Sequence, residues 1–235
     1  MDKEIAIIMA AGLGSRMRPI TETIPKPLVK VFGKSMIETV IDGLCERGVS
    51  DIYIVVGYLK EKFNILLDKY PNIHIVENKD YLVKNNISSI YAVSDVLGEA
   101  DCFICEADLV ISDSSIFKTE LNESCYYGKM VEGYSDDWIF EIQDDYISRV
   151  KKGGTDTYNM VGVSYFKKAD AKILASEIKK AYADEKNSEL YWDEVVDANL
   201  DKLRLRIHPV TEKQIIEIDT VDELKAIDAN AVNII

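Results

Sequence analysis

The stretch that decides the fold is Ile5-Ala-Ile-Ile-Met-Ala-Ala-Gly-Leu-Gly-Ser-Arg-Met-Arg-Pro-Ile-Thr-Glu-Thr-Ile-Pro-Lys-Pro-Leu28. It opens with an apolar run rich in β-branched residues, which is typical of a strand buried on both faces. Gly12 and Gly14 follow, and the missing Cβ lets the backbone turn sharply and bring its N–H groups close to a ligand. Consecutive N–H groups in such a turn form a concavity that suits phosphate oxygens. The same stretch carries the cations Arg16, Arg18 and Lys26. We therefore expect a polyphosphate site where this strand ends.

A Gly-x-Gly pair by itself also fits an ordinary tight turn with incidental surface charge. The dinucleotide-binding fingerprint fits poorly, because it requires a third small residue where Met17 stands. The longer pattern, Ala10-Ala11-Gly12-x-Gly14-x-Arg16-x-x-Pro19-x-Thr21-x-x-x-Pro25-Lys26-x-Leu28, is more specific. It resembles the loop of the nucleotidyltransferases that make activated sugars and alcohols.

In that family the loop wraps a nucleoside triphosphate, and its arginine and lysine contact the phosphates. The resemblance implies catalytic roles for Lys26, near the α-phosphate, and Arg16, on the leaving β- and γ-phosphates. It implies nucleotide binding by Ala10, Ala11, Gly12, Gly14 and Ser15.

Composition sets the outer limits of the interpretation. A chain of 235 residues with 47% hydrophobic composition can bury a substantial core in one domain. We expect a single domain over 1–235, with a nucleotide-binding half over 1–110 and an acceptor-binding half over 111–235. No apolar run is long enough for a membrane span and no signal-peptide pattern is visible. Four cysteines without a disulfide framework fit a reducing cytoplasm.

Charge is distributed unevenly along the chain. The net charge is −13, which argues against a nucleic-acid partner. Residues 1–34 nevertheless contain six basic and three acidic residues, a net of +3, which leaves −16 for the remainder. This segment would attract an anionic small-molecule substrate against a repelling background.

Strand and helix patterns alternate through the first half of the chain. The sequence predicts strands at 51–57, 73–76 and 101–105, and helices at 36–47, 60–70 and 87–97. Ser35 and Glu38 have the spacing of a capping box at the start of the first helix. Such alternation predicts a Rossmann-like open, mostly parallel sheet with helices on both faces. Ligands of such sheets bind beyond the carboxyl ends of the strands, where the glycine loop lies.

Asn85-Asn86-Ile87-Ser88-Ser89 precedes the third helix. Asn86 has the position of an N-cap, and side-chain amides and hydroxyls at a helix start can also bind the polar edge of a base. Related cytidylyltransferases have a similar Asn-Asn-x-x-Ser stretch. We therefore assign base recognition to Asn86 and Ser88, and the same resemblance adds Tyr58 to the nucleotide-binding residues.

Carboxylates follow two of the predicted strands. Glu106 and Asp108 stand at the end of the strand at 101–105, and Asp219 follows a predicted strand at 214–218. Mg²⁺ takes one or two carboxylates together with phosphate oxygens. The family places metal-binding aspartates at both positions, so the resemblance implies that Asp108 and Asp219 hold Mg²⁺ and that Glu106 faces the nucleotide. The alternatives are a strand-end cap for Asp108 and a simple helix start at Asp219, since Thr220 and Glu223 form a capping box.

The second half of the chain reads as short strands and helices. Between 124 and 166 turn residues recur at Gly133, Asp144-Asp145 and Gly153-Gly154, which predicts a small antiparallel meander over the acceptor site. A helix is expected at 168–182. Lys151 and Lys152 either reach the acceptor phosphate or form a solvated turn.

Aromatic residues beside carboxylates suggest the acceptor. Trp138 with Asp137, and Tyr191 with Asp193, would suit a quaternary ammonium through cation–π attraction and charge. The chain resembles bacterial CTP:phosphocholine cytidylyltransferases nearly end to end, at 57–61, 85–86, 191–193 and 217–219. It departs from them in having Asp136-Asp137 before Trp138, where Asn-Glu is expected. Core packing is the alternative for each of these aromatic residues, Trp192 included.

The resulting hypothesis is a cytidylyltransferase that moves CMP from CTP to phosphocholine with Mg²⁺, releasing pyrophosphate. The nearest alternative keeps the chemistry and uses 2-aminoethylphosphonate, whose primary amine prefers carboxylates. A hexose-1-phosphate nucleotidyltransferase and an inactive regulatory homologue fit less well. The expected partners are small molecules without nucleic acid or membrane, and both a fused domain and a homodimer are compatible with the sequence.

Overall fold

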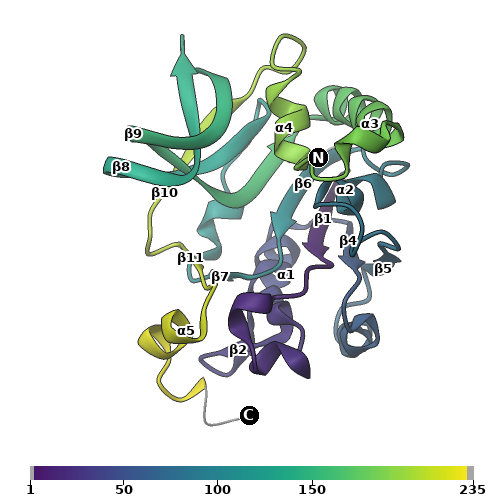
Figure 1. The fold of residues 1–235 in the computed structure, drawn as a ribbon, viewed down its shortest axis with the longest axis vertical. Coiled ribbons are helices and arrows are strands. Elements are labelled where there is room, and N and C mark those ends of the chain that lie inside the picture. Colours follow the sequence, from purple (N-terminus) through teal and green to yellow (C-terminus); the bar gives the residue numbers. More distant parts are fainter. Residues whose placement is uncertain (1–2, 232–235) are drawn as a thin grey trace.

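A seven-stranded, mostly parallel sheet forms the centre of the molecule (Figure 1). The computed structural model describes residues 3–231. The strand order is β10-β8-β9-β6-β1-β4-β5, with β1 parallel to both β4 and β6 and with β9 antiparallel to β6 and β8. Its strands are β1 Glu4–Ala10, β4 Asp51–Val56, β5 Ile73–Glu77, β6 Asp101–Glu106, β8 Cys125–Gln143, β9 Tyr146–Phe166 and β10 Arg206–Val210. The predicted α/β fold class is confirmed.

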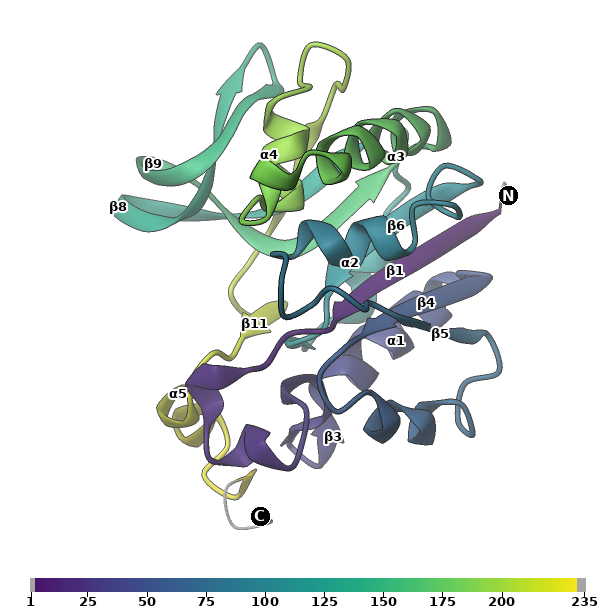
Figure 2. The same ribbon diagram turned by 45° about the vertical axis from the view of Figure 1, so that its right-hand side comes forward.

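Helices cover both faces of this sheet (Figure 2). Side chains alternate across a strand, so Ala6 and Ile8 of β1 pack on one face while Ile5 and Ile7 pack on the other. The first face is covered by α1 (Met36–Arg47), and the second by α2 (Ile87–Ala92), α3 (Lys168–Ala183) and α4 (Trp192–Asp197). None of the helices within residues 3–231 has the length and apolarity to cross a bilayer.

The start of α1 shows how local chemistry sets an element boundary. Glu38 accepts hydrogen bonds from the Ser35 backbone N–H at 3.3 Å and from its hydroxyl at 2.5 Å, so the predicted capping box is present.

Gly33-Lys34-Ser35 also matches the end of a Walker loop, but Leu28 stands where that motif requires its first glycine. The tripeptide instead lies at the hairpin of β2 (Lys30–Val31) and β3 (Lys34–Ser35).

Three elements differ from their predictions. The segment at 60–70 is a 3-10 helix, η4 (Lys60–Leu66), in which the buried Phe63 and Leu66 stand three apart and therefore share a face. The third helix ends at Ala92, after which 93–97 continues in tight turns.

The expected meander is a single long hairpin of β8 and β9. Only Asp144-Asp145 reverses the chain, with φ of 51° and 66° as in a two-residue hairpin turn. Gly133 and Gly153 fall at register irregularities between the two strands. Bulges bend and twist a ribbon without ending it, so the turn residues here mark curvature.

The C-terminal segment returns to the glycine loop. Strand β11 (Ile215–Glu217) pairs antiparallel with β7 (Leu109–Ile111), which places Glu217 opposite Leu109. Helix α5 (Val221–Ile227) then packs beside the loop, as Figure 2 shows. Ile218 and Leu224 share an apolar cluster there with Met17 and Ile20. This pairing brings residues near 108 and 219 to one place.

The cysteines are packing residues. Cys102 belongs to the core cluster on one face of the sheet and Cys105 to the cluster on the other. The four cysteines are free thiols. The side chains of Cys102 and Cys105 are both fully buried.

Substitution of Gly43 by alanine should destabilise the protein, although alanine is the better helix former. A Cβ at position 43 in α1 would lie 2.6 Å from Cδ2 of the buried Phe117 ring. Overpacking costs about 1–3 kcal/mol, against a helix-propensity gain of about 1 kcal/mol. We expect a net loss of about 1 kcal/mol in the free energy of unfolding, measured by urea denaturation.

The double variant Gly43→Ala/Phe117→Leu isolates the steric contribution. Because leucine lacks the ring that the new methyl group meets, the double variant should lose less than the sum of the two single losses. Strictly additive losses would show that the Gly43–Phe117 contact is not the cause.

Candidate active site

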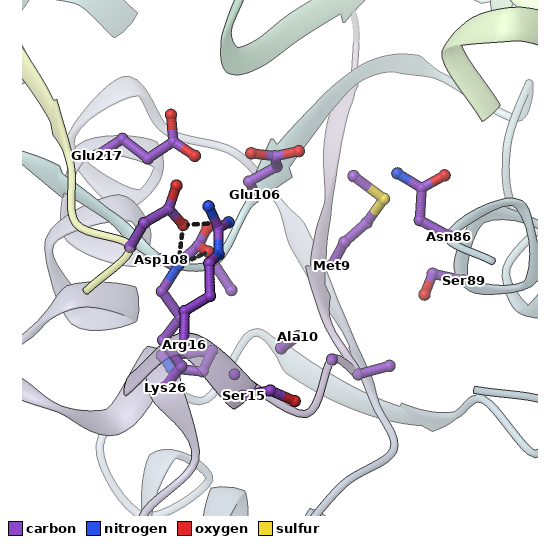
Figure 3. Close-up of a pocket in the computed structure, with 16 residues that line it drawn as sticks. Met9, Ala10, Ser15, Arg16, Lys26, Asn86, Ser89, Glu106, Asp108 and Glu217 are labelled. Carbon is purple, nitrogen blue, oxygen red and sulfur yellow. Dashed lines mark hydrogen bonds and ion pairs between the residues drawn. The ribbon is translucent and has the colours of Figure 1, made fainter. Parts of the chain in front are cut away.

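A cavity of about 390 Å³ lies at the carboxyl ends of β1 and β6 (Figure 3). Figure 3 shows cationic and carboxylate side chains on one side of it and amide and hydroxyl groups on the other. We call it the central cavity. Its lining residues are Met9, Ala10, Ala11, Gly12, Gly14, Ser15, Arg16, Lys26, Pro27, Asn86, Ser89, Glu106, Ala107, Asp108, Glu217 and Asp219.

The glycine loop is held by contacts that a larger residue would break. Gly14 has φ +60°, and a Cβ there would stand 2.9 Å from Cβ of Lys26. The buried Thr21 hydroxyl donates a 2.8 Å hydrogen bond to the Gly14 carbonyl. Met17 is fully buried beneath the loop. The loop therefore wraps around Lys26. Gly14 is required there because a Cβ would collide with the Lys26 side chain and because its positive φ favours glycine.

Lys26 joins the two aspartates that the sequence selected. Its ammonium donates to Oδ2 of Asp108 at 2.6 Å and to Oδ1 of Asp219 at 2.7 Å, and its side chain is only 8% exposed. Arg16 donates to the same Asp219 oxygen at 2.7 Å. Burial acts to lower the pKa of Lys26, but the two carboxylates outweigh it and the net shift is upward. Lys26 is therefore a charged ammonium fixed at the centre of the cavity.

The cavity holds more carboxylates than cations. Glu106 and Glu217 line it together with Asp108 and Asp219. Burial raises the pKa of Glu217 to about 7, with the charges of Asp108 and Asp219 adding to the shift. Burial, followed by Asp108 and Glu217, raises the pKa of Glu106 well above its ordinary value. Because burial and the neighbouring carboxylates disfavour the charged forms of both groups, a cation bound here would stabilise those forms.

The opposite side of the cavity is formed by the start of α2. The Asn86 side-chain oxygen accepts a 2.9 Å hydrogen bond from the backbone N–H of Trp192. Its amide nitrogen is left to donate to a ligand. Ser89 lines the same cavity, while the buried Ser88 accepts from Asn78 at 2.8 Å and lines a neighbouring cavity with Tyr81.

Tyr58 lies outside the central cavity. Its backbone N–H donates to the Ala11 carbonyl at 3.2 Å, and its hydroxyl is 3.5 Å from the Glu22 carbonyl oxygen. The structure thus brings Tyr58 to the back of the glycine loop, away from the lining residues.

The predicted acceptor residues are divided among three environments. Trp138 and Tyr191 meet edge to face, with ring centroids 5.5 Å apart, and line a separate surface cavity. Asp137 accepts a 3.2 Å hydrogen bond from the Asn159 amide. Asp193 is 3% exposed and accepts from the Tyr126 hydroxyl at 2.9 Å. Trp192 packs in the core against Tyr126, as the alternative interpretation of that residue expected.

Two polar residues that line the central cavity, Glu217 and Ser89, were not among the residues predicted from the sequence. Glu217 stands two residues before Asp219, a spacing that places both side chains on one side of an extended chain. That spacing could have indicated that Glu217 faces the same site as Asp219. Ser89 follows Ser88 directly, and which of the two hydroxyls faces the cavity depends on how α2 is rotated.

The chain matches the model of a known protein family over more than half of its length. The model of the family described as "Nucleotidyl transferase" matches residues 5–129, more than half of the chain and including the whole glycine loop. The chain belongs to the nucleotidyl transferase family.

Relatives of this nucleotidyltransferase match over almost its whole length. A 2-aminoethylphosphonate cytidylyltransferase of Lancefieldella rimae is 54% identical, over 97% of this chain and 93% of that protein. A choline-phosphate cytidylyltransferase of Streptococcus pneumoniae is 36% identical, over 95% and 96%. The solved structure of CTP:phosphocholine cytidylyltransferase from Streptococcus pneumoniae superposes with a TM-score of 0.89 at 34% identity, covering 97% of this chain and 98% of that one.

The burial of Asp193 predicts a pH-dependent stability effect. Burial raises its pKa to about 7, so the folded state keeps a proton that the unfolded chain releases near pH 4. The free energy of unfolding contributed by this group therefore falls as pH rises through this window. Asp193→Asn removes the charge and keeps an oxygen for Tyr126. We expect Tm of the variant minus that of wild type to increase between pH 5 and pH 8.

The size of this effect follows from linkage. Each pH unit inside the window is worth up to about 1.4 kcal/mol, and 1 kcal/mol shifts Tm by about 2–4 °C at this chain length. The control is Asp95→Asn, because the Asp95 side chain is 93% exposed. A Tm difference for Asp193→Asn that stays constant with pH, as expected for the control, would contradict a raised pKa.

Proposed function

We propose that this nucleotidyltransferase transfers CMP from CTP to 2-aminoethylphosphonate and releases pyrophosphate. The observation that carries the proposal is the 54% identity, over 97% of the chain, to a 2-aminoethylphosphonate cytidylyltransferase. The sequence alone favoured phosphocholine, so the comparison moves the preferred acceptor from a quaternary to a primary amine.

The distribution of charged and aromatic groups supports a primary amine. A primary ammonium carries three N–H donors and binds carboxylates well. Glu106 and Glu217 line the central cavity, whereas Trp138 and Tyr191 line a different one. A quaternary ammonium has no N–H and depends on aromatic faces. The carboxyl groups of the central cavity therefore suit an amine that donates hydrogen bonds.

Phosphocholine is the second candidate. It is supported by the choline-phosphate cytidylyltransferase at 36% identity and by the superposed structure of a CTP:phosphocholine enzyme. Trp138 and Tyr191 remain the residues of this chain that a quaternary ammonium would use.

The chain's own residues can perform the transfer by position and charge. An oxygen of the acceptor phosphonate attacks the α-phosphorus in line, and the bond from that phosphorus to the bridging oxygen breaks as pyrophosphate leaves. Such transfers need little covalent help from the protein. Lys26 would stabilise charge on the α-phosphate, and Arg16 would hold the departing β- and γ-phosphates. The glycine loop N–H groups would bind the remaining phosphate oxygens.

Asp108 and Asp219 are the residues that would hold Mg²⁺. One oxygen of each lies within 2.7 Å of the same Lys26 nitrogen, so the two carboxylates converge on one point. Residues 3–231 offer no cluster of three or more His, Cys, Asp or Glu side chains for a metal. Two carboxylates suit Mg²⁺, which commonly takes its other ligands from phosphate and water. When bound, the ion would act as a Lewis acid toward phosphate oxygens.

Base recognition is proposed for Asn86. With its oxygen held by the Trp192 N–H, its amide nitrogen can donate to the O2 or N3 acceptor of cytosine. Ser89 replaces Ser88 as the hydroxyl that lines the same cavity.

Removal of the Lys26 ammonium should nearly abolish turnover. Loss of one preorganised charge of this kind costs about 3 kcal/mol of activation free energy, or about a hundredfold in kcat. The measurement is pyrophosphate release by Lys26→Ala with CTP and Mg²⁺. Arg18→Ala is the control, because Arg18 comes from the same loop but is exposed and does not line the central cavity. A rate near wild type for Lys26→Ala would refute the assigned role.

Parallel assays with different acceptors test the proposed substrate. Pyrophosphate release is measured with 2-aminoethylphosphonate, phosphocholine and glucose-1-phosphate at equal CTP. We expect kcat/KM for 2-aminoethylphosphonate to exceed that for phosphocholine by tenfold or more, about 1.4 kcal/mol of discrimination, with no turnover of the sugar phosphate. A preference for phosphocholine would reverse the order of the two candidates.

A further inference from the structure

A lysine ammonium of the chain itself lies over the aromatic pair of Trp138 and Tyr191. The rings meet edge to face at 61°, with Trp138 on β8 and Tyr191 directly before α4. Lys152 of β9 pairs with Trp138 across the hairpin. Its ammonium nitrogen lies 5.5 Å from the Trp138 ring centroid and 5.6 Å from that of Tyr191. Both distances are within the range of cation–π attraction.

The position of Lys152 is distinct from that of its neighbour. Lys151 pairs with Glu141 at 2.5 Å, whereas Lys152 forms no ion pair with any residue among 3–231. Both lysines line the surface cavity of the aromatic pair, but of the two only Lys152 has its ammonium over the rings. The two lysines therefore have the same charge and different partners.

The aromatic pair is connected to the central cavity through the residue that follows Tyr191. Tyr191 precedes Trp192, whose backbone N–H holds the Asn86 amide at the central cavity. Trp138 follows Asp137, and a register shift between Ser135 and Trp138 marks a bulge in β8 at this point. Bulges re-aim side chains next to active sites. A cation on these rings would therefore lie on a segment that continues directly to the wall of the central cavity.

We propose that Lys152 is a specificity-determining residue that excludes quaternary ammonium acceptors. Its ammonium takes the cation position of the Trp138–Tyr191 pair, so a trimethylammonium group meets a like charge where it needs an aromatic face. This inference rests on the proposed function, since it explains how a family fold that can hold a choline group prefers a primary amine.

The chemistry of the two acceptors makes the exclusion selective. A quaternary ammonium has no N–H donor, so the loss of the aromatic faces removes its main attraction. A primary ammonium donates up to three hydrogen bonds and can bind carboxylates instead. Lys152 therefore disfavours one acceptor much more than the other, which is how a repulsive element produces specificity.

The variant Lys152→Met tests the inference, because methionine keeps the length of the side chain and removes its charge. The quantity measured is kcat/KM for phosphocholine divided by kcat/KM for 2-aminoethylphosphonate. We expect this ratio to rise about tenfold, the scale of one cation–π contact and one like-charge repulsion. Lys151→Met is the matched control and should keep the wild-type ratio, because Lys151 does not touch the rings.

A second readout does not depend on turnover. The chain has two tryptophans, and Trp192 is buried in the core. Choline chloride should therefore change the fluorescence of Trp138 at lower concentration in Lys152→Met than in wild type or Lys151→Met. Equal choline titrations in all three proteins would overturn the inference.

The remaining outcomes separate the inference from the proposed function. If wild type prefers phosphocholine, the proposed function fails. If wild type prefers 2-aminoethylphosphonate and Lys152→Met leaves the ratio unchanged, only the role of Lys152 fails. If Lys152→Met loses activity with 2-aminoethylphosphonate and gains none with phosphocholine, Lys152 binds the acceptor phosphonate and the exclusion model is wrong.

Discussion

The ion pairs of Lys26 with Asp108 and Asp219 are the interaction on which the active site depends. They connect positions separated by 82 and 193 residues in the chain. The glycine loop, the end of β6 and the segment after β11 meet at this one buried ammonium. A buried charge is costly unless it is paired, so the two aspartates stabilise the buried position of the Lys26 ammonium. The apolar cluster between the loop and α5 supplies the packing that keeps them there.

The excess of carboxylates around Lys26 gives the site its chemical character. Glu106 and Glu217 add two carboxyl groups whose pKa burial raises, so their charged forms are disfavoured until a cation binds beside them. Such a cavity favours ligands that bring cations: a metal ion with the triphosphate, and an ammonium with the acceptor. Acceptor choice then depends on whether the ammonium donates hydrogen bonds to carboxylates or stacks on the rings of Trp138 and Tyr191.

Much of the fold could be predicted because its signals are local. The buried run of β1, the capping box at Ser35 and the alternation of strand and helix specify the parallel sheet and the bounds of α1. The prediction of short strands between 124 and 166 was wrong because turn residues such as Gly133 and Gly153 also serve at bulges. The type of helix at 60–70 was equally ambiguous in the sequence, because apolar residues three apart fit a 3-10 helix as well as an α-helix.

The sequence by itself determined the reaction class, because the phosphate loop is one contiguous motif whose glycines and cations need no distant partner to be recognised. It also selected Lys26, Asp108 and Asp219, which the structure joins. Only the tertiary structure decided the rest. In the structure Asp193 is buried and accepts a hydrogen bond from Tyr126, Trp192 packs in the core, and the Lys152 ammonium lies over the rings of Trp138 and Tyr191. These outcomes depend on contacts between side chains of strands and helices that lie far apart in the chain. The periodicity of apolar residues along the sequence does not specify such contacts.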